Sequence, residues 1–108
     1  MPELIGKTIN KLTTDNYVSC LLIQPPTRMS RVIFWVNELN ANAIEFIVYG
    51  SMDGITYASV AVVANTDVAK NANAFTAAIT DPWIFLDLQI RANVGAAQGR
   101  VTVYATGS

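Results

Sequence analysis

Residues able to do chemistry are scarce in this 108-residue chain, and nearly all are carboxylates. It has no histidine, and its one cysteine, Cys20, lies in the apolar run of residues 17–23. These facts exclude Ser-His and Cys-His nucleophilic pairs and nearly all zinc sites. A glycosidase would need two carboxylates facing each other across a cleft, for which a small domain has little room. Asp53 or Asp67 could give calcium one ligand, but turn chemistry explains both. We predict a protein that is not an enzyme, with no catalytic, metal or cofactor site.

The surface of the protein is constrained by its composition. Apolar residues make up 52% of the chain and charged residues 14%, against about 25% charged in a typical soluble domain. Part of the surface must therefore be apolar, and large apolar patches usually mark interfaces. The alternative is a monomer whose strands are buried on both faces. The net charge is −1 and the basic residues are scattered, so we expect no nucleic-acid partner.

Targeting signals are not visible in the sequence. The first residues, 1–4, have neither a basic stretch nor an apolar segment typical of a secretory signal. No apolar run approaches the roughly 20 residues that span a bilayer. We expect synthesis in a cytoplasm, no membrane partner and no internal disulfide, because Cys20 has no second cysteine to pair with.

Residues 44–63 organise the predicted fold. Apolar residues alternate along 44–49 and again along 57–63, which is typical of two half-buried strands. Between them, Ser51, Asp53 and Gly54 are typical of a hairpin turn, because Gly54 can adopt a positive φ and Asp53 can bond the following backbone. We predict a tight hairpin here.

The rest of the chain gives further short strands separated by turn residues. Residues 1–16 are predicted to be an N-terminal arm or a short first strand, and residues 17–108 a β-sandwich domain. The predicted class is an all-β, single-domain, antiparallel, jelly-roll-like sandwich of seven or eight short strands without a long helix. The other predicted strands are 17–24, 31–38, 75–80, 83–93 and 100–106, and the predicted connections are 25–30, 39–43, 64–74 and 94–99.

Four aromatic residues are candidate interface residues. Trp83 and Phe85 share the outward face of strand 83–93, with its other face, from Ile84 onward, in the core. Trp35 and Tyr49 belong to strands that are apolar on both faces. Such rings suit a partner protein or a sugar. The alternative is that a neighbouring loop or the N-terminal segment covers them.

Apolar residues on both faces of strands 31–38, 44–49 and 57–63 predict self-association. A two-layer sandwich buries only one face of each sheet. The short loops cannot cover the second face, and the segment 1–16 cannot cover three strands. We therefore predict a homo-oligomer, with a trimer favoured, in which residues 1–16 reach a neighbour or a shell.

Two segments resemble small bacteriophage virion proteins and discoidin-type jelly rolls. A strand ending in G-S-x-D-G-x-x-[Trp/Tyr] is similar to the hairpin of these proteins, and it is formed by Val48, Gly50, Ser51, Asp53, Gly54 and Tyr57. The closing strand pair of the phage proteins is similar to residues 88–93, the turn through Gly95 and Gly99, and residues 100–104.

This resemblance implies a non-enzymatic structural protein of a virion. It implies a capsid decoration or minor head protein, or a small tail component, with capsid or other virion proteins as partners. The alternative is a carbohydrate-binding module of a host-recognition structure. In that case Trp83, Phe85 or Tyr57 would be the platform on which a sugar of a glycan stacks.

Overall fold

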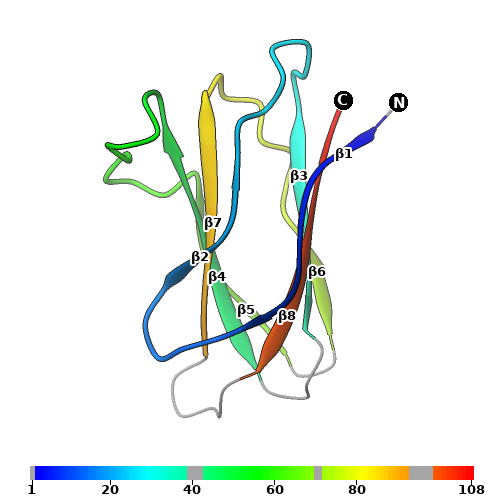
Figure 1. Ribbon diagram of the computed structural model, residues 1–108, viewed down its shortest axis with the longest axis vertical. Coiled ribbons are helices and arrows are strands. Elements are labelled where there is room, and N and C mark those ends of the chain that lie inside the picture. Colours follow the sequence, from blue (N-terminus) through cyan, green and yellow to red (C-terminus); the bar gives the residue numbers. More distant parts are fainter. Residues whose placement is uncertain (1, 39–42, 70–71, 93–98) are drawn as a thin grey trace.

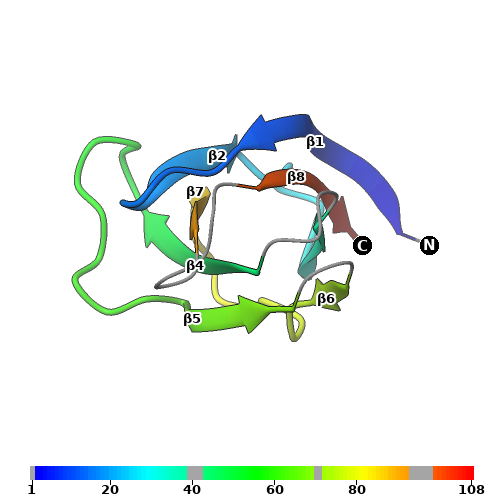
Figure 2. The same cartoon turned by 90° about the horizontal axis from the view of Figure 1, so that it is seen from below.

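The computed structural model describes residues 2–38, 43–69, 72–92 and 99–108, which form eight β-strands and no helix. The strands make two four-stranded antiparallel sheets that face each other (Figures 1 and 2). Sheet A has the order β1-β8-β3-β6, and sheet B has the order β2-β7-β4-β5. The predicted antiparallel β-sandwich is confirmed. Its strands are β1 (Glu3–Leu12), β2 (Val18–Ile23), β3 (Val32–Glu38), β4 (Ile44–Ser51), β5 (Val63–Val68), β6 (Asn73–Phe75), β7 (Phe85–Ala92) and β8 (Arg100–Gly107).

The core lies between the sheets and takes alternate residues from the central strands. In β7, Leu86, Leu88 and Ile90 are buried, as the alternation predicts. Ile84 was predicted to share that face, but it is 42% exposed because β7 begins only at Phe85. The largest side chains that are fully buried include Phe34, Val36, Ile44, Phe46, Val48, Val101 and Val103.

The predicted hairpin is wrong in its second strand. β4 pairs with β5, which begins at Val63, so residues 52–62 form a long connection. Within the predicted strand 57–63, Tyr57 makes an isolated bridge to Ser51, and Val63 pairs with Val48 as the first residue of β5. Backbone hydrogen bonds to the Asp53 side chain explain this, because they hold the chain in a wider loop than a two-residue turn.

Residues 64–74 were predicted to be a loop, and this is also wrong. They contain most of β5 and the first residues of β6, which are the edge strands of the two sheets. An edge strand pairs on one side only and tolerates polar residues, so its sequence resembles a loop. The predicted strand 75–80 is misplaced, because it shares only Phe75 with β6, and Ile79 makes only an isolated bridge to Val32.

The first strand lies at the edge of sheet A. β1 pairs with β8 from Glu3 to Leu12, with two register shifts, and Asn10 has a φ of 61°. Thr8 Oγ1 donates a hydrogen bond to the Cys20 carbonyl and so ties β1 to β2 of the other sheet. Most of the predicted connections 39–43 and 94–99 lie outside the described residues. In the part of the chain that is described, no helix is long and apolar enough to cross a membrane.

Candidate interaction surfaces

A row of aromatic rings crosses the outer face of sheet A. Phe75 on β6, Trp35 on β3 and Tyr104 on β8 are paired in register, so their side chains stand side by side. The rings of Trp35 and Phe75 stack with centroids 5.3 Å apart and an interplanar angle of 12°. Tyr104 lies 5.5 Å from Trp35, on the next strand. We call these three residues the aromatic row; Lys7 on β1 continues its register.

The aromatic row is only partly covered. Phe75 is 66% exposed, whereas Trp35 and Tyr104 are half-buried. The Nε1 atom of Trp35 is buried and has no hydrogen-bond partner among the described residues. Because the rings of Trp35 and Phe75 face each other, the parts of the row that are exposed to solvent are the ring edges and the other face of Phe75. Such an apolar ridge suits contact with another protein surface.

The connection between β4 and β5 is held in one conformation by its own polar groups. Asp53 Oδ1 accepts hydrogen bonds from the backbone N–H groups of Ile55 and Thr56, both at 2.8 Å, and from Ser51 Oγ at 3.0 Å. These bonds, led by the one from Ile55, lower the pKa of Asp53. Gly54 follows with a φ of 77°. The loop is therefore preorganised.

This anchored loop presents apolar side chains to solvent. Met52, Ile55 and Val60 are 57%, 84% and 77% exposed. In Figure 1 the loop, in green, stands out from the sandwich at the end of β4. An ordered loop that keeps large apolar side chains in water is typical of a docking element, because little ordering cost remains on binding.

Replacing Gly54 with valine should destabilise the protein by about 1–3 kcal/mol, because a β-branched residue is strained at this positive φ. A Cβ would also lie 3.2 Å from the Phe85 ring. Urea denaturation followed by circular dichroism measures the loss. Gly54→Asn is the matched control and should cost less, since asparagine tolerates this conformation. Equal stability of Gly54→Val and the wild type would show that the turn does not need a left-handed residue.

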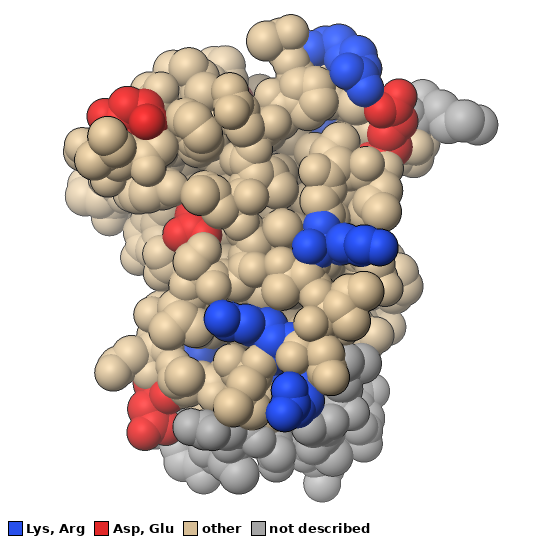
Figure 3. Space-filling view, in the orientation of Figure 1, with Lys and Arg blue, Asp and Glu red and all other residues tan. Residues whose placement is uncertain are grey.

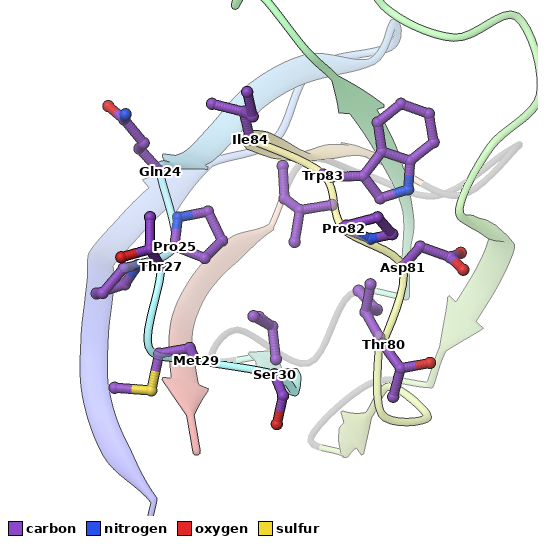
Figure 4. Close-up of a pocket in the computed structure, with 14 residues that line it drawn as sticks. Gln24, Pro25, Thr27, Met29, Ser30, Thr80, Asp81, Pro82, Trp83 and Ile84 are labelled. Carbon is purple, nitrogen blue, oxygen red and sulfur yellow. The ribbon is translucent and has the colours of Figure 1, made fainter.

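Trp83 closes one end of the core. Its ring packs on Gly50 of β4 so closely that no side chain fits there. Beside it lies an open hollow of about 570 Å³ between the segments 24–32 and 79–86. Figure 4 shows Pro25, Met29 and Thr80 around this hollow, with Trp83 at its side. Asp81 is the one charged residue among the described residues that line the hollow, and prolines and apolar side chains make up most of the lining.

The outer face of sheet B carries a polar network. Glu45 on β4 is buried and forms an ion pair with Arg91 on β7, with Oε2 and Nη2 2.6 Å apart. Tyr17 Oη donates a hydrogen bond to the same carboxylate at 3.2 Å, and the Arg91 guanidinium lies 4.5 Å from the Tyr17 ring centroid. The hydrogen bond to Glu45 raises the pKa of Arg91. Asp67 on β5 pairs in register with Glu45 and therefore lies beside this polar network.

A second carboxylate on this face is also held by its neighbours. Asp87 on β7 is buried and accepts hydrogen bonds from Ser19 Oγ at 2.6 Å and Gln89 Nε2 at 3.0 Å. Tyr49 lies opposite Asp87 in the register of β4 and β7. The arrangement is structural, since each buried carboxylate is used by fixed donors. The described residues contain no cluster of three metal-binding side chains.

The free energy of unfolding should fall at alkaline pH, because the Cys20 thiol and the Tyr17 phenol both have raised pKa values in the folded protein. Burial raises the pKa of the Cys20 thiol from 9.0 to about 12. Burial, and next Glu45, raise the pKa of Tyr17 from 10.0 to about 12. The unfolded chain therefore loses these protons first, and stability is lost as pH rises from 9.0 toward about 12. We expect the urea midpoint to drop across this window, and to drop less steeply in Cys20→Ala. If the urea midpoint falls with pH as steeply in Cys20→Ala as in the wild type, the loss of stability does not come from the Cys20 thiol.

The structure separates the four predicted interface residues. Trp35 lies in the aromatic row, and Tyr49 lies on the outer face of sheet B. Trp83 packs against the core, and Phe85 lies under Gly54. The segment that covers these last two rings is 50–54, rather than the N-terminal segment or the loop at Pro25-Pro26. The prediction missed Phe75 and Tyr104, because only the pairing of β6 and β8 with β3 brings them to Trp35.

Comparisons with known proteins bear on the fold. No family model matches the chain, and no curated protein is similar to it. Among solved structures, PirA is similar with a TM-score of 0.59 and 11% identity, over 89% of this chain and 90% of that one. The PBSX exported protein XepA has a TM-score of 0.63 and 11% identity, over 100% of this chain and 37% of XepA. A protein of Bacillus endospore appendages, which form disulfide-linked pili, has a TM-score of 0.51 and 12% identity, over 100% of this chain and 87% of that one.

These similarities show a shared sandwich fold. The identities are too low to carry a function from one protein to another. The chain spans little more than a third of XepA. The resemblance to discoidin-type jelly rolls stays a prediction.

Proposed function

We propose that this chain is a non-enzymatic structural protein of a bacteriophage virion, a capsid decoration or minor head protein that stabilises the shell through subunit contacts. The anchored loop 52–62 is the observation that carries the proposal. Ile55 is 84% exposed, and its backbone N–H and that of Thr56 donate hydrogen bonds to Asp53. Val60 in the same loop is 77% exposed. Exposed apolar side chains on such a loop are expected in a protein that docks on a partner, and catalysis does not require them.

The physical basis of the proposed role is burial of apolar surface. A contact stabilises by roughly 25 cal/mol for each Å² of apolar area removed from water, before the cost of association is subtracted. A chain with 14% charged residues has little desolvation cost to overcome over much of its surface. The sandwich fold is compatible with assembly, since the spore appendage protein of the same fold belongs to pili.

Co-sedimentation with capsid shells tests this role. The shells are assembled from the major capsid protein encoded in the same genome, and the purified chain is added. We expect the wild type to sediment with the shells and Ile55→Asp to remain in solution. Ala64→Asp is the matched control, because it adds the same charge at an exposed position of β5. Absence of the wild type from the shell pellet would contradict a capsid role.

A carbohydrate-binding module is the second candidate, and the free face of Phe75 favours it. This ring is 66% exposed at the edge of sheet A, where a sugar ring could stack on it. Trp83 and Phe85 offer less, because they pack on Gly50 and Gly54. A glycan array that gives a signal with the wild type and none with Phe75→Ala would support this function over the capsid role.

A further inference from the structure

We infer that copies of this chain associate head to tail, with the outer face of sheet A in one copy against the outer face of sheet B in the next. The inference rests on the proposed structural role and names a partner for it, a second copy of the chain. It concerns contacts between copies, whereas the loop 52–62 is proposed to meet the shell.

Charge is divided between the two sheets. The ion pairs among the described residues are Glu3–Arg28 and Glu45–Arg91. Among the described residues outside these pairs, the basic residues occur on the strands of sheet A or just before them: Lys7, Lys11, Arg31 and Arg100. Lys11 pairs in register with the core residue Val101, so it lies on the side of sheet A that faces sheet B, and all four are exposed. Among the acidic described residues outside the pairs, Asp67 and Asp87 lie on strands of sheet B, where Asp67 is exposed and Asp87 is buried. Asp53 lies in the connection between two strands of sheet B, whereas Asp15 and Asp81 lie in connections between the two sheets. Glu38, at the end of β3, is an acidic residue within sheet A.

The surface view agrees with this division. Figure 3 looks onto the edge of the sandwich at β1 and β2, with the outer faces of the two sheets at the sides of the view; blue side chains lie over the right and the lower centre, and red side chains lie mainly along the left. The red group at the upper right touches a blue one. Two copies that meet through unlike faces bring opposite charges together, whereas like faces would repel.

Both outer faces also carry apolar side chains that need a cover. The aromatic row crosses sheet A beside Lys7, with Phe75 66% exposed. On sheet B, Leu22 is 51% exposed and pairs in register with Asp87. Each face therefore offers an exposed apolar side chain and an exposed charge, Phe75 and Lys7 on sheet A and Leu22 and Asp67 on sheet B.

The symmetry of such a contact follows from the fold. The outer faces of a two-sheet sandwich point in opposite directions (Figure 2). A contact between unlike faces is therefore heterologous, and repetition gives a closed ring or an open filament, rather than a twofold dimer.

Charge reversal on the two faces tests this arrangement. Lys7 and Asp67 are both exposed, one beside the aromatic row and one on β5 of sheet B. We expect the wild type to self-associate in sedimentation velocity at low salt and less at high salt. Lys7→Glu and Asp67→Lys should each weaken association by about tenfold or more, because like charges then meet. The double variant Lys7→Glu/Asp67→Lys should recover it.

The control and the possible outcomes separate the alternatives. Asp15→Lys makes the same charge change in the connection before β2 and should leave association unchanged, and thermal melts verify that each variant is folded. A monomeric wild type, single reversals without effect, or a double variant without recovery would each overturn the head-to-tail contact. Binding of the wild type and Ile55→Asp to shells is measured separately. Absence of self-association would therefore contradict the head-to-tail contact and not the proposed function.

Discussion

Gly50→Ala is expected to lower the free energy of unfolding by about 3 kcal/mol, because it overfills the end of the core. A Cβ at Gly50 would lie 2.5 Å from Cε2 of Trp83 and closer still to Cδ2. Gly50 is the next-to-last residue of β4, but it pairs with Leu86 of β7 and its carbonyl accepts a hydrogen bond from Ala58 N, so the backbone cannot move aside cheaply. Urea denaturation monitored by tryptophan fluorescence and circular dichroism measures the change.

A double-mutant cycle shows whether the Trp83 ring causes this loss. Trp83→Ala removes the ring, so adding Gly50→Ala to that variant should cost less than 1 kcal/mol, which gives a coupling of about 2 kcal/mol. Gly107→Ala is the control at a second buried glycine, where the nearest atom is the flexible end of Met29 at 3.0 Å. Wild-type stability in Gly50→Ala would show that Trp83 does not occupy this position.

Arg91→Met is expected to cost about 3 kcal/mol, because it leaves the Glu45 carboxylate buried without its cation. The Glu45 side chain is 8% exposed and the Arg91 side chain 31% exposed. The methionine keeps much of the apolar stem, so the loss reports on the charge. Tyr17 still donates its hydrogen bond to Glu45 in the variant.

The matched variant removes both charges. Glu45→Gln combined with Arg91→Met should recover most of the lost stability, since a neutral amide is much less costly to bury than an unpaired carboxylate. Thermal melts at neutral pH compare the two variants. Equal stability of Arg91→Met and the wild type would show that the ion pair is a surface pair of little value.

Much of the fold could be predicted because the central strands alternate between core and surface. Residues 85–92 and 100–107 show this alternation, and so do the burial patterns of β7 and β8. β5 and β6 could not be found in this way. Their sequences, VANTDV and NAF, carry few core residues, and pairing with β4 and β3 makes them strands.

The surfaces were less predictable than the strands. Trp35 was recognised as an interface candidate, but its neighbours Phe75 and Tyr104 lie 40 and 69 residues away from it in the sequence. Cross-strand register sets such neighbours, and short-range patterns do not contain it. Phe85 was assigned to the open face for a similar reason, because the loop above it depends on hydrogen bonds of Asp53.

The position of β8 within sheet A has a consequence for how the chain folds. β8 lies between β1 and β3, so the earliest strand pairs with the latest one, with Glu3 opposite Gly107. Sheet A has no centre until residues 100–107 are made, while all four strands of sheet B precede them. Such non-local pairing slows folding to roughly milliseconds to seconds. During synthesis, β1 must therefore wait unpaired for β8, and β3 can pair on one side only, with β6. Chaperone protection is most valuable in that interval.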